Sequence, residues 1–292
     1  MFQGSLVALV TPFRDGKVDE AKLRDLVEFH IKNGTDALVP CGTTGESPTL
    51  SHEEHKRVID IVIEKAAGRV PVVAGTGSNS TAEAIDLTAH AKKAGADAVL
   101  MVNPYYNKPT QRGLIEHYKA VMDAVDIPII LYNIPGRTGV NMLPETVAAL
   151  AEYPNIVGIK EASGNLEQMT QIIVLCGDKI TVVSGDDTLT LPLMAVGGKG
   201  VISVVANIVP KDVAEMIHAA LNGDWKRARE MHLRLFPLCQ AMFYETNPIP
   251  VKTAMGLLGM ISPELRLPLS PMSEANVKRL KEAMKRYGLL KE

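Results

Sequence analysis

Lys160 is the residue of this chain whose type and position most directly suggest chemistry. It stands at the end of the apolar run "NIVGIK", where a buried strand normally carries another aliphatic residue. Residues two apart on a strand share a face, so we expect Lys160 to point the same way as Ile156 and Gly158. A lysine desolvated there has a lowered pKa, and its neutral amine can form a Schiff base with a carbonyl. The alternative is a lysine that leaves the strand into solvent, as most lysines do.

Hydroxyl groups and an arginine follow other apolar runs. Tyr132 ends "IILYN", where a phenol could relay protons; the alternative is a core tyrosine with a solvated hydroxyl. Arg137, in "PGRTG", could clamp a carboxylate through paired hydrogen bonds, or could be a solvated loop residue. The turn "CGTTGE" offers backbone N–H groups and two hydroxyls, from Thr43 and Thr44, to a carboxylate. These residue types predict Schiff-base chemistry on a keto acid.

The sequence contains little that favours a metal site. His52 and His55 occur in "HEEH", which is not the H-E-x-x-H pattern of zinc enzymes, so we expect a solvated helix start. Three cysteines, Cys41, Cys176 and Cys239, form no C-x-x-C pair and favour reduced thiols in a cytosol.

Composition narrows the class of partner. A net charge of −2 and a pI near 6.4 give no electrostatic reason to bind nucleic acid or an anionic membrane. The apolar N-terminus is stopped by Pro12 and lacks a basic region, so we expect no targeting or transmembrane segment. A small molecule or another protein is the expected partner.

The elements that must position these residues alternate regularly. Each apolar run is followed by an amphipathic stretch, which predicts a parallel sheet and, with about eight repeats, a (β/α)8 TIM barrel. An open doubly wound sheet is the alternative, although no G-x-G-x-x-G follows the first run. In a barrel the strand ends that carry Lys160, Tyr132 and Arg137 converge. The predicted strands are 5–12, 37–42, 70–77, 98–104, 128–135, 156–163, 180–187 and 200–207, and the predicted helices are 19–33, 51–67, 81–94, 111–125, 144–152, 165–176, 187–197 and 210–221.

The pattern changes after the eighth strand and its helix. Only helical stretches follow, so we divide the chain into a catalytic barrel, 1–223, and a C-terminal helical region, 224–292. Pro237 lies within the first of these stretches and is expected to kink or divide it.

The motifs "GTTGES", "NPYYNKP", "YNIPGRTG", "GIKEASG" and "NPIPVK", in this order and spacing, resemble those of the dihydrodipicolinate synthase family. That family belongs to the class I aldolase superfamily that includes N-acetylneuraminate lyase, and the resemblance covers essentially the whole chain. It implies condensation of pyruvate with L-aspartate 4-semialdehyde, the entry step to diaminopimelate and lysine, without metal or organic cofactor. It assigns the Schiff base to Lys160, a proton relay to Tyr132, Thr43 and Tyr106 (the last from a neighbouring subunit), and substrate contacts to Thr44, Arg137, Gly185 and Ile202.

The resemblance also implies assembly and regulation. It suggests a cytoplasmic homotetramer, built as a dimer of dimers, and feedback inhibition by L-lysine at the tight dimer interface. Glu83 would accept from the ligand's ammonium groups; the alternative is that it closes a capping box with Ser80. Pro48 departs from the alanine of the lysine-sensitive pattern and leaves the affinity open. The residues matching the lysine contacts are Ser47, His52, His55, Asn79, Glu83 and Tyr105.

Two other functions fit parts of the pattern. A related lyase acting on sialic acid or a 2-keto-3-deoxy sugar acid would share the lysine and tyrosine, but such relatives generally lack the arginine of "GRTG". Arg137 therefore favours the synthase. A regulator that binds keto acids without turnover would not explain why Lys160, Tyr132 and the threonines occur together.

Overall fold

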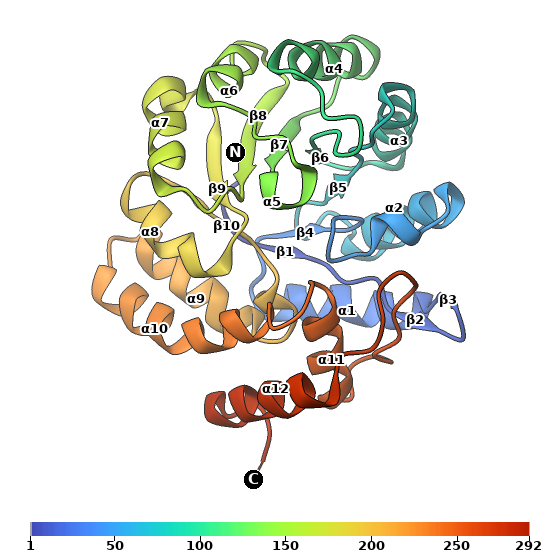
Figure 1. Cartoon of the computed structure of the whole chain (residues 1–292), viewed down its shortest axis with the longest axis vertical. Helices are drawn as coiled ribbons and strands as arrows, with labels where there is room; N and C mark the ends of the chain where they lie inside the picture. Colours follow the sequence, from blue (N-terminus) through green and yellow to red (C-terminus); the bar gives the residue numbers. More distant parts are fainter. Residues whose placement is uncertain (1, 292) are drawn as a thin grey trace.

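Eight parallel strands form a nearly closed barrel surrounded by helices (Figure 1). The computed structural model describes residues 2–291. Neighbouring strands follow the order β4-β1-β10-β9-β8-β7-β6-β5, and a parallel bridge between Leu38 and Val72 joins the two outermost strands. The predicted (β/α)8 barrel is therefore confirmed, and the open doubly wound alternative is wrong. The strands are β1 (Gly4–Ala8), β4 (Ala37–Val39), β5 (Val73–Gly75), β6 (Ala98–Val102), β7 (Ile129–Asn133), β8 (Ile156–Glu161), β9 (Thr181–Ser184) and β10 (Gly200–Ser203).

Five of the eight helices that cover the barrel begin after a residue whose side chain caps the first turn. At the start of α2, Ser51 and Glu54 form a complete capping box, as their spacing predicts. At the start of α3, the Ser80 hydroxyl accepts from the Glu83 amide, but the Glu83 carboxylate accepts from Ser78 Oγ. The second predicted capping box is therefore only half formed, which leaves Glu83 facing the cavity described below. These helices are α1 (Glu20–Lys32), α2 (His52–Ala66), α3 (Thr81–Ala94), α4 (Gln111–Ala124), α6 (Pro144–Leu150), α7 (Leu166–Cys176), α8 (Thr190–Ala195) and α9 (Pro210–Leu221).

Two small elements were not predicted. A hairpin of β2 (Phe13–Arg14) and β3 (Lys17–Val18) turns at Asp15 and Gly16, both of which have positive φ. An Asp-Gly pair is the usual signal of such a turn, but strands of two residues are too short to give a periodic pattern. One helical turn, α5 (Pro135–Thr138), carries Arg137 and ends at Gly139, which is left-handed.

The core has an inner and an outer layer. Side chains inside the barrel form one cluster, and those between the strands and the helices form a larger one. Ile156 packs in the outer cluster, so the prediction that it shares a face with Lys160 is wrong. The cause is a register irregularity: Ile129 pairs with Ile156, but the next residue of β7, Ile130, pairs with Gly158. The side chain of Ile156 therefore no longer points to the same face as Gly158 and Lys160. The inner cluster consists of Leu6, Ala8, Ala37, Val39, Val73, Ala98, Leu100, Ile130, Tyr132, Val183 and Ile202.

Three further helices follow the barrel, α10 (Trp225–Ala241), α11 (Ile249–Leu257) and α12 (Glu274–Tyr287), and they lie beside α9 and α1 (Figure 1). Pro237 lies inside a continuous α10, so the prediction that it divides the helix is wrong. The carbonyl that its missing N–H frees belongs to Leu233, whose side chain is exposed, and water can solvate that face. Within residues 2–291, no helix is both long enough and apolar enough to span a membrane.

Candidate active site

Lys160 points into the barrel interior near the end of β8. It is 5% exposed, so the alternative of a solvated lysine is wrong. Its Nζ lies 4.3 Å from the centroid of the Tyr132 ring, and the two residues are paired across β7 and β8. Gly185 makes room for the lysine, because a Cβ at that position would lie 3.0 Å from Lys160 Cε. The amine and the phenol therefore share one enclosed space, where a carbonyl compound could react with both.

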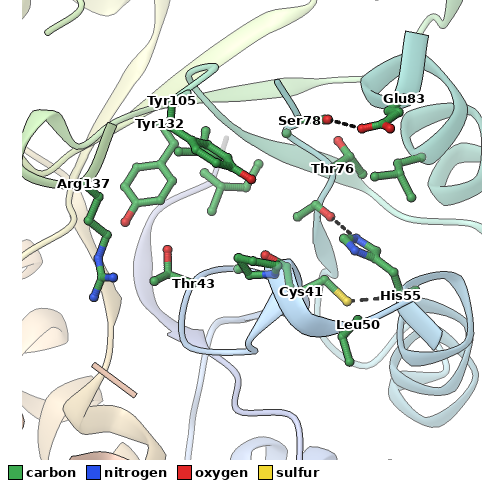
Figure 2. Close-up of a pocket in the computed structure, with 18 of the residues that line it drawn as sticks. Cys41, Thr43, Leu50, His55, Thr76, Ser78, Glu83, Tyr105, Tyr132 and Arg137 are labelled. Atoms are coloured by element: carbon green, nitrogen blue, oxygen red, sulfur yellow. Dashed lines mark hydrogen bonds between the residues drawn. The ribbon is translucent and has the colours of Figure 1, made fainter. Parts of the chain in front are cut away.

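The loop after β4 brings two threonines to this end of the barrel. Cys41 and Glu46, at the ends of "CGTTGE", both have positive φ, which folds the loop back tightly. Thr43 lines the same cavity as Tyr132, and Figure 2 shows the two side chains facing the same space. Thr44 is buried, and its Oγ1 accepts a hydrogen bond from Asn247 Nδ2 at 3.0 Å. Of the two hydroxyls, Thr43 is the one beside Tyr132.

A buried ion pair fastens this loop to the C-terminal helices. Lys252 Nζ lies 2.6 Å from Glu46 Oε1, and both side chains are fully buried. The Lys252 ammonium also lies over the ring of Phe13, at 4.2 Å from its centroid. Burial lowers the pKa of Lys252, while the Glu46 carboxylate acts in the opposite direction. Sequence reasoning missed this pair, although Lys252 stands in the quoted motif "NPIPVK".

Arg137 stands at the edge of the cavity on α5. Its side chain is exposed, and Nη2 donates to the backbone carbonyl of Asn247 at 3.0 Å. Asn247 therefore bridges Arg137 and Thr44, a contact that sequence reasoning also missed. In Figure 2 the guanidinium lies on the same side of the cavity as Tyr132 and Thr43. A carboxylate entering the cavity would meet this charge.

Gly185 and Ile202 are predicted to line the pocket around Lys160 through backbone groups, and both lie in or beside the barrel interior, so this assignment stays a prediction. The Gly185 N–H donates to the backbone carbonyl of Glu161 at 2.8 Å, so that N–H is already used in a hydrogen bond to β8. Ile202 is fully buried in the inner cluster. Gly185 also contributes the space that Lys160 occupies, as described above.

Tyr105 and Tyr106 lie on the exposed loop after β6. Their exposed fractions are 41% and 86%, and both backbone N–H groups donate to Asn79 Oδ1. Tyr105 lines the cavity, whereas Tyr106 does not. Within this chain Tyr106 is thus separate from Lys160, Tyr132 and Thr43.

Most of the residues predicted to bind lysine line the same cavity, whose volume is about 410 Å³. Figure 2 shows Glu83 and His55 on the side opposite Arg137. His55 is buried, with Nε2 2.7 Å from the Gly75 carbonyl, and burial lowers its pKa, so the prediction of a solvated histidine is wrong for His55. His52 is exposed at the helix start. Five of the six predicted residues, Ser47, His52, His55, Glu83 and Tyr105, are lining residues, and Asn79 holds the tyrosine loop instead.

The cavity offers no other obvious nucleophile. Cys41 lines it, but burial raises the pKa of its thiol far above the usual range. Among residues 2–291, no group of three or more His, Cys, Asp or Glu side chains is placed to hold a metal ion. The Lys160 amine lies beside Tyr132, which lines the cavity, so the chemistry available at this end of the barrel centres on that amine and the neighbouring hydroxyls.

Known proteins resemble this chain over almost its full length. The model of the dihydrodipicolinate synthetase family matches residues 1–287. A 4-hydroxy-tetrahydrodipicolinate synthase from Geotalea uraniireducens (strain Rf4) is 64% identical, over 99% of this chain and 100% of the relative.

Solved structures agree with that similarity. A dihydrodipicolinate synthase from Acinetobacter baumannii, described as chloride-inhibited and complexed with pyruvate, has a TM-score of 0.97 at 49% identity, covering 99% of this chain and 100% of that one. One from Cyanidioschyzon merolae with lysine bound has a TM-score of 0.96 at 44% identity, covering 99% of each chain.

Proposed function

Because the chain belongs to the dihydrodipicolinate synthetase family, we propose that the buried pair of Lys160 and Tyr132 carries out that family's reaction. The chain condenses pyruvate with L-aspartate 4-semialdehyde to give 4-hydroxy-tetrahydrodipicolinate, in the pathway to diaminopimelate and lysine. The observation that carries the assignment of residues is the Lys160 amine, enclosed at the barrel end 4.3 Å from the Tyr132 ring centroid.

The first step joins Lys160 to pyruvate. The Nζ lone pair attacks the keto carbon, and the resulting carbinolamine loses water to leave a protonated imine. Protons must reach the departing oxygen and leave the nitrogen. Tyr132 and Thr43 line the space where this occurs and supply the relay, completed by Tyr106 of a neighbouring subunit.

The imine then makes the pyruvate methyl group a carbon nucleophile. The positive nitrogen withdraws electrons, a methyl proton is lost, and an enamine forms. The enamine carbon attacks the aldehyde, forming a C–C bond and a hydroxyl group while the imine is regenerated. The amine of the adduct then attacks the imine carbon and displaces Lys160 as the ring closes, which frees the enzyme.

Two groups bind the substrate carboxylates. Thr44 helps hold the pyruvate carboxylate from the loop that Lys252 and Glu46 fasten. Arg137 binds the semialdehyde carboxylate at the edge of the cavity, where its charge is exposed and its fork can pair with two oxygens. Asn247 contacts both residues and so links the two proposed binding groups.

The functional assembly is a homotetramer of two tight dimers in the cytoplasm. Tyr106 is 86% exposed on its loop and has a large apolar ring with a polar hydroxyl, which suits insertion into a neighbouring subunit. The three cysteines are free and buried, as expected in a reducing compartment.

L-Lysine is a feedback inhibitor of this chain, bound beside Glu83 and Tyr105. Support comes from the lysine-bound relative and from the cavity lining of this chain. The Glu83 carboxylate, held by Ser78, offers an acceptor to an ammonium group. Tyr105 precedes Tyr106 directly, so a ligand that displaces Tyr105 also displaces a relay residue.

Borohydride reduction in the presence of pyruvate tests this function. The protein is treated with both reagents, digested, and mapped by mass spectrometry. The expected result is a reduced pyruvate adduct on Lys160 alone, with none on exposed lysines such as Lys92 and Lys93. An unmodified Lys160, or equal labelling of all three lysines, would contradict the proposal.

A further inference from the structure

Glu161, next to the proposed Schiff-base lysine, is a fully buried carboxylate on the opposite face of β8. It lies outside the barrel interior, among residues that pack between the strands and α7. An aliphatic side chain is expected there, because a buried carboxylate without partners is strongly unfavourable. The proposed reaction gives Glu161 no role, since its side chain lies on the face of β8 opposite to Lys160.

Three donors surround this carboxylate. The Ser163 N–H lies 2.6 Å from Oε1, and Oε2 accepts from Asn133 Nδ2 at 2.9 Å and from Gln168 Nε2 at 3.3 Å. Burial raises the pKa of Glu161, while the bonds from Ser163 and Asn133 lower it. Both oxygens are thus matched by donors from β7, from α7 and from the turn that leaves β8.

The strand register gives this carboxylate a specific position. Tyr132 pairs with Lys160 across β7 and β8, and the next pair in the register is Asn133 with Glu161. Successive residues of a strand point to opposite faces, so the polar pair Asn133–Glu161 stands directly behind the pair Tyr132–Lys160. The hydrogen bond between Asn133 and Glu161 therefore joins the same two strands from the outside.

The network extends to the segment that follows Arg137. Asn133 Nδ2 donates to Asn141 Oδ1 at 2.8 Å, and Asn141 exchanges two hydrogen bonds with Gln168 at 2.7 and 3.1 Å. On its other side, Asn133 Oδ1 accepts from the Met142 N–H at 2.9 Å. The ends of β7 and β8 and the segment after Arg137 therefore meet in one buried group of hydrogen bonds.

We propose that Glu161 and Asn133 are positioning residues that hold the Lys160 amine and the Tyr132 phenol in their reactive alignment from behind the barrel wall. The proposal rests on the proposed function, which makes Lys160 the nucleophile. Neither residue touches substrate. Their effect comes through the adjoining peptide units, where a displacement of about 1 Å in a reacting group can cost about a hundredfold in rate.

The first test is Glu161→Gln, which keeps the size of the side chain. The new side chain carries one oxygen and one NH2 group. If the NH2 group takes the place of Oε1 it faces the Ser163 N–H, and if it takes the place of Oε2 it faces the NH2 groups of Asn133 and Gln168. In either orientation a donor therefore meets a donor. We expect kcat and the rate of borohydride trapping at Lys160 to fall together, by about tenfold or more, with a change in the pyruvate KM below about threefold.

Asp36→Asn is the matched control. Asp36 is also a carboxylate that accepts from a backbone N–H, that of Ser5 at 2.7 Å, but it precedes β4 at the opposite end of the barrel. It is half-buried and also lies 2.8 Å from His218 Nε2, so it controls for loss of a structural carboxylate away from Lys160. We expect this variant to lower the melting temperature while leaving kcat and the trapping rate near those of the unaltered protein.

A double variant tests the hydrogen-bond pattern itself. In Asn133→Asp with Glu161→Gln, the carboxylate and the amide exchange places, so the net charge is unchanged. If the Asn141 and Gln168 amides both rotate by half a turn, every donor again meets an acceptor. We expect the double variant to recover most of the activity lost in Glu161→Gln, to within about threefold of the unaltered protein.

The outcomes distinguish failure of the proposed function from failure of the positioning role of Glu161 and Asn133. Trapping at Lys160 in the unaltered protein is measured in parallel, and its absence overturns the proposed function. If that trapping occurs but Glu161→Gln keeps kcat and trapping within about twofold, with a loss of melting temperature like that of Asp36→Asn, Glu161 is only structural and the positioning proposal fails. A folded double variant no more active than Glu161→Gln also overturns it. If the double variant does not fold, the trapping rate of Glu161→Gln decides the question.

Discussion

Tyr132 and Tyr106 belong to regions of the molecule with opposite surroundings. Tyr132 is 4% exposed on β7, beside Lys160 and in front of a buried hydrogen-bond network. Tyr106 is 86% exposed on a loop whose adjacent backbone amides are held by Asn79. Lys160 and Tyr132 are brought together by strands of this chain, whereas the loop presents an aromatic side chain that this chain leaves uncovered. The first region should therefore depend on internal packing, and the second on a partner subunit.

The largest effect is expected from Lys160→Ala, which removes the amine from the strand-end site. We expect kcat to fall by about a thousandfold or more and borohydride trapping of pyruvate to disappear, because no other nucleophile is placed to form the imine. Lys92→Ala, on the exposed surface of α3, is the control and should behave like the unaltered protein. Substantial pyruvate trapping in Lys160→Ala would show that the reactive amine lies elsewhere.

The next effect concerns the exposed loop. Tyr106→Phe should lower kcat by about a hundredfold or more if its hydroxyl completes a proton relay. Mixing it with Lys160→Ala subunits should then restore activity, up to about a quarter of the unaltered level, since half of the dimers are hybrids with one intact site.

Subunit exchange must be verified by native mass spectrometry before the mixture is assayed. If Tyr106→Phe is active before it is mixed, or if the mixture stays inactive after subunit exchange is proven, Tyr106 does not act in a neighbour's site. The contrast between the two tyrosines would then have to be explained without a partner subunit.

Arg137→Ala tests the role of the charged side chain at the edge of the cavity. Loss of a charge-assisted carboxylate contact worth about 1.5–3 kcal/mol should lower kcat/KM for aspartate semialdehyde by about ten- to a hundredfold. Imine trapping with pyruvate alone should change little, because Arg137 lies at the cavity edge. Arg112→Ala, exposed on α4, is the control. A rise confined to the pyruvate KM would assign Arg137 to the wrong substrate.

The smallest expected effect is on lysine binding beside Tyr105. Glu83→Ala should weaken L-lysine binding by about tenfold in a calorimetric titration, with kcat in the absence of lysine little changed. Glu116→Ala, exposed on α4, controls for the lost negative charge. Unchanged affinity in Glu83→Ala would place the ligand elsewhere, and no binding at millimolar lysine to the unaltered protein would remove the site.

Most elements of the fold could be predicted from the sequence. The eight strands and their helices follow from local periodicity, capping residues and β-branched runs, which act over a few residues and therefore leave a local signal. Exceptions arose where the signal was too short or where tertiary packing outweighed it. The β2–β3 hairpin has only two residues a strand, and α10 continues through Pro237, where the freed Leu233 carbonyl lies on an exposed face.

The site likewise contains residues that could be predicted from the sequence and residues that could not. Lys160, Tyr132, Thr43 and Arg137 were found from residue type and from their place after apolar runs, and the barrel brings all four to one end. Asn247 and Lys252 were not assigned roles, because their partners lie about two hundred residues away: Thr44 is 203 positions from Asn247, and Glu46 is 206 from Lys252. No spacing rule connects positions so far apart.

The sequence by itself determined where the strands lie and that a lysine and a tyrosine end two of them, and hence that the two could meet inside a barrel. Only the tertiary structure decided that the outer strands close through Leu38 and Val72, that one cavity contains both Thr43 and Glu83, and that Glu161 has three donors behind Lys160. The physical reason is that periodicity is a property of the local backbone. A hydrogen bond between strands depends instead on register, and at β8 an irregular pairing set that register.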